Sequence, residues 1–134
     1  MSRVSFSRLL IALATLAALA CKPVFAELAI HIHAEKAMFQ VLMLPGRVGA
    51  DSFVLQLMDG EGNLLKAREA TLTLSLPGRG VTPLERKATS GADGYWHVRD
   101  VPIPYPGRWH VRIDVLTAGS DRITLEDELN VPAR

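Results

Sequence analysis

The sequence predicts an all-β protein, an antiparallel β-sandwich of about seven to eight short strands. Apolar and polar residues alternate along most of the chain after residue 26, which is the period of a half-buried strand. Glycine, proline, aspartate and asparagine separate these segments at spacings of roughly 8–12 residues, as turns between sandwich strands do. The one helical candidate, residues 64–70, is too short to weigh against this pattern.

The first 26 residues resemble a secretory signal peptide and are set apart from the fold. Arg3 and Arg8 supply positive charge, residues 9–20 are apolar or small except for Thr15, and Val24-Phe25-Ala26 forms a cleavage signal. A helix of that apolar length spans only about 18 Å, short of a hydrocarbon core of about 30 Å. We therefore expect a signal peptide at 1–26, a β-sandwich domain at 27–134, export across the membrane and no membrane span after cleavage.

Cys21 offers an alternative to cleavage after Ala26. Ala18-Leu19-Ala20-Cys21 resembles a bacterial lipobox, in which the cysteine is acylated and anchors the protein to a membrane. Ala18 stands where a large aliphatic residue is usual, which favours cleavage over lipoprotein anchoring. Since Cys21 is the only cysteine, a disulfide framework, a CxxC redox pair and a cysteine zinc site are excluded.

The expected strands follow one another with clear turns between them. The first alternates apolar and polar residues, and the second is apolar except for Gln40 and ends at Pro45-Gly46. The fourth has the cleanest alternation, with leucines on one face and hydroxyls on the other. The fifth is polar and begins with a proline, as is typical of an edge strand. In order, the strands are expected at 30–33, 38–44, 52–57, 71–76, 83–89, 95–101, 109–115 and 123–131.

Strands of this number and length favour an immunoglobulin-like or cupredoxin-like sandwich, with a small barrel as the alternative. Trp109 opens the apolar alternation of the seventh strand, directly after the turn at Pro106-Gly107. We expect its side chain to lie between the two sheets. Asp127 interrupts the apolar face of the last strand.

The residues offer no catalytic arrangement. The chain has no GxSxG, P-loop, GxGxxG or HExxH motif. Glu126, Asp127 and Glu128 are consecutive and so point to alternating faces of a strand. A formal net charge of +1 and scattered basic residues give no case for nucleic acid. We expect that the protein is not an enzyme and binds no nucleic acid.

His31-Ile32-His33, followed by Met38 and Met43, is the one chemically suggestive pattern. Residues two apart in a strand share a face with Cα atoms roughly 7 Å apart. Imidazoles at that spacing can converge on one ion, and soft thioethers favour Cu(I). The sequence therefore suggests a copper site with His31, His33 and Met38 or Met43 as ligands. The alternative is that both histidines are solvated and both methionines fill the core.

His97 and His110 lie on polar strand faces, where we expect surface imidazoles.

Three stretches carry a family resemblance: 31–38 with Pro45-Gly46-Arg47-Val48-Gly49, 69–75 leading to Pro83-Leu84, and 91–96 through 104–109. Together they resemble YtkA-like and FixH-like domains, and in particular the extracytoplasmic C-terminal domain of bacterial copper-resistance protein D family transporters. The resemblance covers nearly all of 27–134. It implies a β-sandwich tied to periplasmic copper handling without enzymatic activity. Here a signal peptide replaces the membrane helices, which implies a free-standing periplasmic version.

Two functions follow as expectations. The first is a periplasmic protein that binds or delivers copper through His31 and His33 with Met38 or Met43. The second is a non-metal interaction module that docks on a membrane partner, a copper transporter or an oxidase-assembly factor, with strand-edge pairing as its mode.

Overall fold

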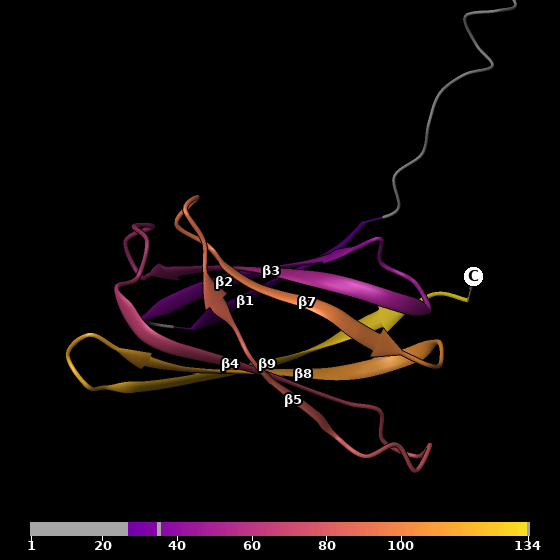
Figure 1. The fold of residues 1–134 in the computed structure, drawn as a ribbon. Coiled ribbons are helices and arrows are strands. Elements are labelled where there is room, and N and C mark those ends of the chain that lie inside the picture. Colours follow the sequence, from indigo (N-terminus) through magenta and orange to yellow (C-terminus); the bar gives the residue numbers. More distant parts are fainter. Residues whose placement is uncertain (1–26, 35, 134) are drawn as a thin grey trace, which may run out of the picture.

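The computed structural model describes residues 27–34 and 36–133, and these residues form nine strands in two sheets (Figure 1). The signal-peptide and lipobox predictions concern residues outside this range. The five-stranded sheet has the order β1-β2-β3-β7-β6 and the four-stranded sheet the order β5-β4-β8-β9. The strands are β1 (Leu28–Ala34), β2 (Ala37–Leu44), β3 (Gly49–Asp59), β4 (Ala67–Ser75), β5 (Leu84–Lys87), β6 (Thr89–Ser90), β7 (Trp96–Ile103), β8 (Gly107–Thr117) and β9 (Arg122–Val131).

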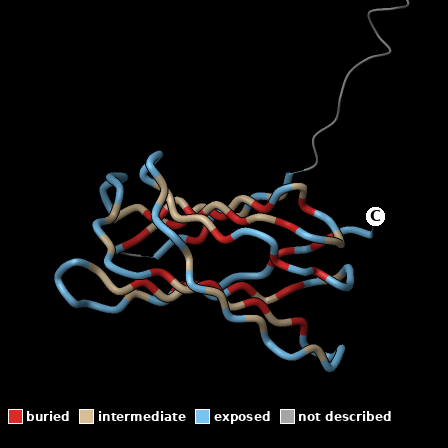
Figure 2. Tube along the Cα trace, in the orientation of Figure 1, coloured by how far each residue is buried: buried red, intermediate tan, exposed pale blue. Residues whose placement is uncertain are grey.

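Every strand pair is antiparallel, and the two sheets stack as a sandwich (Figure 1). The predicted β-sandwich is thus confirmed. Buried and less buried residues alternate along the strands of both layers, so the core lies between the sheets (Figure 2). Trp109 is 1% exposed in this core, and its indole Nε1 donates a hydrogen bond to the Tyr105 carbonyl at 2.9 Å.

The expected single strand at 83–89 is two strands in different sheets. β5 pairs with β4, and β6 pairs with β7. The chain changes layers at Ala88, whose backbone N–H donates to the Ala70 carbonyl at 2.9 Å. β5 is an edge strand, as its proline and charges predict. The crossover also explains why nine strands form where seven or eight were expected.

On the other side of the sandwich, β1 and β9 are the edge strands of their sheets and lie close to each other. β9 carries charge along its length, including Asp127, which is exposed although its position in the alternation faces the core. An inward-pointing charge on an edge strand discourages further pairing. Both sides of the sandwich are therefore partly closed, one by the β5–β6 crossover and the other by β1 against β9.

The helical candidate at 64–70 is wrong, because β4 already begins at Ala67. Leu64 instead forms a bridge with Met58 of β3. Pairing with β8 overrides the local helical pattern of so short a segment. In the part of the chain that the structure describes, there is no helix that could cross a membrane.

Asp51 at the start of β3 is 2% exposed and holds the turn between β2 and β3. Its Oδ1 accepts hydrogen bonds from the backbone N–H groups of Gly46 at 2.9 Å and Arg47 at 3.4 Å. Its Oδ2 is buried without a partner among the described residues. A Cβ at Gly46, where φ is +84°, would come within 2.9 Å of the Leu28 backbone nitrogen. The turn therefore packs tightly on the start of β1.

Candidate metal centre

His31 and His33 lie on β1 with exposed side chains on the same face. Their imidazole rings are stacked, with centroids 6.4 Å apart and planes inclined by 24°. The alternation of the strand places Ile32 between them on the core side, where it is 4% exposed. The two histidines thus share the outer face of the five-stranded sheet, as their spacing predicts.

The register between β1 and β2 places Met38 directly opposite His33. The register between β2 and β3 then places Met58 directly opposite Met38. Directly opposite residues in antiparallel strands project from the same face with Cβ atoms about 4.5–5.5 Å apart. His33, Met38 and Met58 therefore form a line across three adjacent strands, which we call the His–Met row. Met38 and Met58 are half-buried.

Met43 does not belong to this face. It is 0% exposed and forms part of the core with Phe39 and Val41, which alternate with the outward residues of β2. Met38 and Met43 are five residues apart, an odd number, so a continuous strand sends their side chains to opposite faces. The structure thus brings Met38 to the histidines and keeps Met43 away from them.

Met58 is a candidate ligand that the sequence reasoning missed. The expected third strand stopped at residue 57, whereas β3 continues to Asp59. Ser52, Val54, Gln56 and Met58 share the outward alternation of that strand. Extending the expected strand by one residue, to 58, would have assigned Met58 to the outer face. Its position beside Met38 depends on the β2–β3 register, which the alternation alone does not give.

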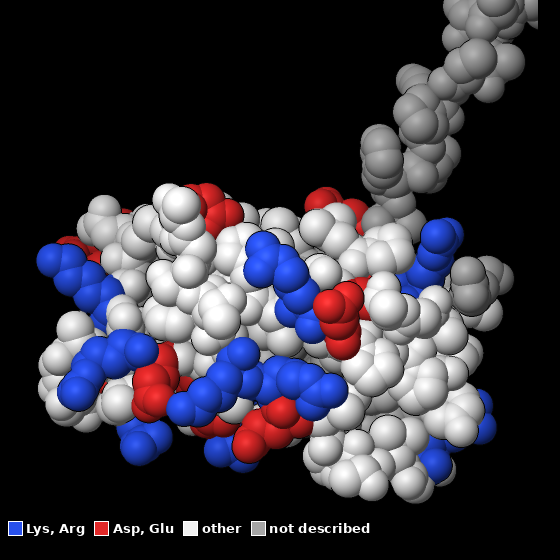
Figure 3. All heavy atoms as spheres, viewed as in Figure 1, with Lys and Arg blue, Asp and Glu red and all other residues white. Residues whose placement is uncertain are grey.

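The outward positions beside the His–Met row, on the side away from the β1–β2 turn, are uncharged. His31, Gln40 and Gln56 form a second line beside it, and Ala29, Leu42 and Val54 a third. No Lys, Arg, Asp or Glu lies at these nine outward positions. The opposite sheet differs, and in Figure 3 the charged side chains gather mainly over the lower, four-stranded layer. The outer face of β1, β2 and β3 is therefore neutral, with thioether and imidazole as its metal-binding groups.

The other two histidines have carboxylate partners. His97 Nε2 lies 3.0 Å from Asp93 Oδ2, and His110 Nε2 lies 2.6 Å from Glu126 Oε1. The hydrogen bond with His97 holds the pKa of the Asp93 carboxyl below its ordinary value. His110 is on β8 of the four-stranded sheet. His97 is on β7, where it lies opposite Val54 of β3, and β3 separates it from β2. Neither belongs to the His–Met row.

The residues of the outer face fit a soft metal ion better than a hard one. Within 27–34 and 36–133, no three His, Cys, Asp or Glu side chains group as a metal site. Two thioethers beside two imidazoles are instead the donor set that suits Cu(I), since methionine sulfur is a soft ligand. Calcium and magnesium prefer oxygen ligands, which this face supplies only as the two glutamine amides. The donor chemistry thus agrees with copper.

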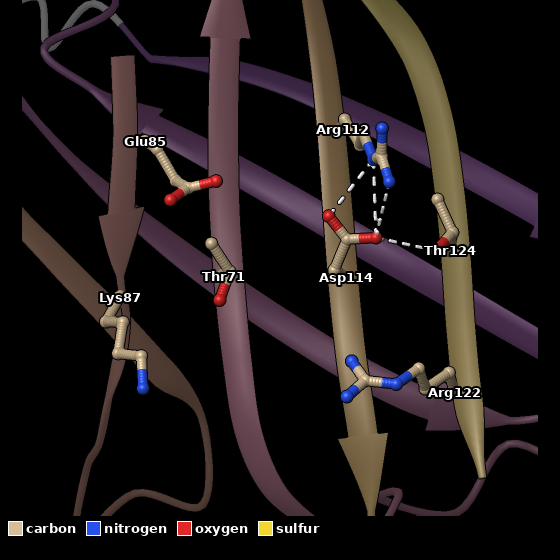
Figure 4. A pocket seen from close by; sticks show the side chains of 7 residues that line it. All are labelled: Thr71, Glu85, Lys87, Arg112, Asp114, Arg122 and Thr124. Carbon is tan, nitrogen blue, oxygen red and sulfur yellow. Dashed lines mark hydrogen bonds and ion pairs between the residues drawn. The ribbon is translucent and has the colours of Figure 1, made fainter.

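A hollow on the four-stranded sheet is the main competing site (Figure 4). Three of its charged side chains are in ion pairs: Lys87 lies 2.8 Å from Glu69 outside the hollow, and Arg112 lies 3.0 Å from Asp114. Glu85 and Arg122 also line the hollow. Thr124 donates a hydrogen bond to Asp114 at 2.6 Å. We interpret this surface as a solvated network of ion pairs.

Comparison with protein-family models, with curated proteins and with solved structures found no match for this chain. The resemblance to the YtkA-like and FixH-like domains therefore remains an expectation from the residues that carry it.

Proposed function

We propose that this protein is a periplasmic copper-handling protein that binds Cu(I) on the outer face of its five-stranded sheet. The ligands are His31, His33, Met38 and Met58. The observation that carries the proposal is the His–Met row, in which two thioethers and an imidazole lie opposite one another on three adjacent strands. The stacked ring of His31 adds a second imidazole beside the row.

The arrangement suits binding and release rather than catalysis. The imidazoles are exposed and the thioethers half-buried, so a bound ion lies at the surface within reach of a partner's ligands. Soft, neutral donors bind Cu(I) without requiring a charged partner group. We accordingly propose that the protein is not an enzyme and that copper is its cargo.

Location and partner belong to the same proposal. Residues 1–26 have the pattern of a secretory signal, and the resemblance points to periplasmic copper handling. The partner we propose is a membrane copper transporter or an oxidase-assembly factor that exchanges the ion at the exposed face.

A second candidate is the interaction module without metal, which the neutral surface of β1, β2 and β3 favours. A face without charge over three strands can dock on a similarly neutral partner with little desolvation cost. The two candidates differ in one measurable property, because the interaction module binds no copper.

Titration with Cu(I) under anaerobic conditions, against a competing chromophoric chelator, tests the proposal. We expect one equivalent to bind, with saturable shifts of the His31 and His33 NMR signals. Acidification should weaken binding because a protonated imidazole cannot ligate. The double variant His31→Ala, His33→Ala should lose most of the affinity.

The matched control is the double variant His97→Ala, His110→Ala, which removes the same number of imidazoles outside the His–Met row. It should bind Cu(I) as the unchanged protein does. If the control pair abolishes binding and the first pair does not, the site is elsewhere. If neither pair matters, the assignment of His31 and His33 as ligands fails. If the unchanged protein binds no Cu(I), the interaction module takes the place of the copper proposal.

A further inference from the structure

A hollow that shares no residue with the His–Met row lies at the crossover side of the sandwich, between the two layers. This shallow hollow of about 500 Å³ is lined by Val48, Gly49, Ala50, Arg86, Asp100, Pro102, Ile103 and Pro104. These residues come from the start of β3, the end of β7 and the edge strand β5. Most of the lining is apolar, with one cation and one anion. Ligand sites of this size commonly combine such a lining with a few placed polar groups.

Asp100 reaches the hollow because β7 is bulged there. Val98 pairs with Phe53 and Val101 pairs with Asp51, so Arg99 and Asp100 together stand opposite the single residue Ser52. Asp100 adopts a left-handed backbone with φ of +53°. Aspartate and asparagine enter this region more readily than other residues that carry a side chain. Bulges often change the direction of a side chain next to a functional site, and here the re-aimed group is a carboxylate.

Arg86 approaches from the other layer. It lies opposite Leu72, a core residue, so its side chain projects from the inner face of β5 at the rim of the sandwich. Its guanidinium makes one hydrogen bond among the described residues, to the carbonyl of the adjacent Glu85 at 3.3 Å. No ion pair joins Arg86 to Asp100 or to another acid of the described chain. The hollow therefore presents one cation and one anion that the fold does not pair with each other.

We propose that this hollow binds a short zwitterionic peptide, a di- or tripeptide with apolar side chains. The guanidinium of Arg86 pairs with its free carboxylate, and the carboxylate of Asp100 with its free ammonium. The floor formed by Val48, Pro102 and Ile103 takes the apolar side chains. The hollow is open to solvent, so a peptide bound there would remain partly exposed. The site shares no residue with the His–Met row and does not depend on copper.

The probe is the tripeptide alanyl-leucyl-alanine, followed by chemical-shift changes in the protein as exported by a bacterial host. Two capped forms, N-acetylated and C-amidated, each remove one terminal charge. We expect saturable shifts centred on the residues of the hollow. Each cap should weaken binding about tenfold, since a hydrogen bond between charged groups is lost.

The variants Arg86→Gln and Asp100→Asn make the test specific. Asparagine tolerates the left-handed backbone, so the second variant retains the bulge. Arg86→Gln should weaken the free peptide about tenfold but leave the C-amidated form unchanged. Asp100→Asn should weaken binding of the free peptide about tenfold but leave binding of the N-acetylated form unchanged. The control Lys87→Gln removes a neighbouring charge from the opposite face of β5 and should change neither.

Two outcomes overturn the proposal. One is the absence of any saturable shift up to about 10 mM peptide, a weaker affinity than specific sites generally show. The other is that each cap lowers the peptide's affinity for the variants as much as for the unchanged protein. In that case Arg86 and Asp100 do not recognise the peptide's termini. Arg86 then serves as an inward-pointing charge that protects the edge of β5.

Discussion

At the scale of single residues, Met38 and Met43 are the methionines nearest the histidines in sequence, but they lie in different environments. Met38 lies on the neutral outer face beside His33, whereas Met43 is completely buried among the core residues. Chemical similarity therefore does not decide which thioether is available to a metal. The face of the strand decides it, and Met58 from the neighbouring strand provides the second thioether.

Substituting each methionine by leucine separates these roles, because leucine retains volume and removes sulfur. Met38→Leu and Met58→Leu should each lower Cu(I) affinity by at least about tenfold, since even indirect partners of metal ligands contribute about that much. Met43→Leu should leave the affinity unchanged and cost less than about 1.5 kcal/mol of stability. Chelator competition measures the affinity. Loss of copper in Met43→Leu alone would contradict the assigned ligands.

Trp109 is the largest side chain of the core and is also tied to the turn before β8. Its indole donates to the Tyr105 carbonyl at 2.9 Å while the ring is 1% exposed. Trp109→Ala should lower the free energy of unfolding by about 3–5 kcal/mol, as large-to-small core substitutions do. Urea denaturation measures the change. A loss below about 1 kcal/mol would show that the cavity collapses or that the ring is not in the core.

At the scale of elements, β5 and β4 are joined by an ion pair across their edge. Lys87 Nζ lies 2.8 Å from Glu69 Oε1 on the solvent side. The hydrogen bond and charge of Lys87 lower the pKa of Glu69 below its ordinary 4.5. The same contact with Glu69 raises the pKa of Lys87 above its ordinary 10.5. Both groups are therefore more stable in their charged forms in the folded protein.

The direction of these shifts fixes a pH window. A lowered carboxyl pKa stabilises the fold above pH 4.5, and this contribution is lost as the pH falls through the folded value. A raised ammonium pKa stabilises it below pH 10.5, and this contribution is lost as the pH rises through the folded value. Lys87→Gln should thus destabilise the protein between these limits and lose its effect in strong acid.

Urea unfolding at about pH 7 and about pH 2.5 measures this difference, which should be small for so exposed a pair. Lys36→Gln is the control, because it also removes one positive charge and Lys36 forms no ion pair within the described chain. It should show no such window. An equal effect of Lys87→Gln at both pH values would mean that the pair contributes nothing through its charge.

At the scale of the whole molecule, the two outer faces of the sandwich have different chemistry. The four-stranded sheet carries several charged side chains, some of them in ion pairs such as Arg112 with Asp114 (Figure 4). The outward positions of β1, β2 and β3 are uncharged. Paired surface charges contribute little stability but keep a face soluble. The neutral face is then the one suited to contact a partner.

Processing of the chain is the prediction that concerns the molecule as a whole. Mass spectrometry of the exported protein should find Glu27 as its first residue, because Val24-Phe25-Ala26 matches a signal cleavage site. Cleavage removes Arg3, Arg8 and Lys22 and no acid, which takes the formal net charge from +1 to −2. The product should focus at a mildly acidic pH. An acylated Cys21 at the N-terminus would instead place the protein on a membrane surface.

The sequence by itself determined the β-sandwich, the burial of Trp109, the edge position of β5 and the shared face of His31 and His33. The burial of Trp109 and the shared face of the two histidines follow from alternation within one strand, which assigns every side chain to a face. The edge position of β5 follows from its charges and the proline before it. The strand positions follow from turn residues in the same way. These predictions need no knowledge of which strands are neighbours.

Only the tertiary structure decided that Met58 accompanies Met38, and that residues 83–89 divide between the two sheets. It also placed Arg86 and Asp100 on one hollow. All three depend on which strands pair and in what register, and a shift of one residue would reverse every face. Register is set by contacts between distant parts of the chain and by bulges such as the one at Asp100. Local sequence patterns do not contain that information.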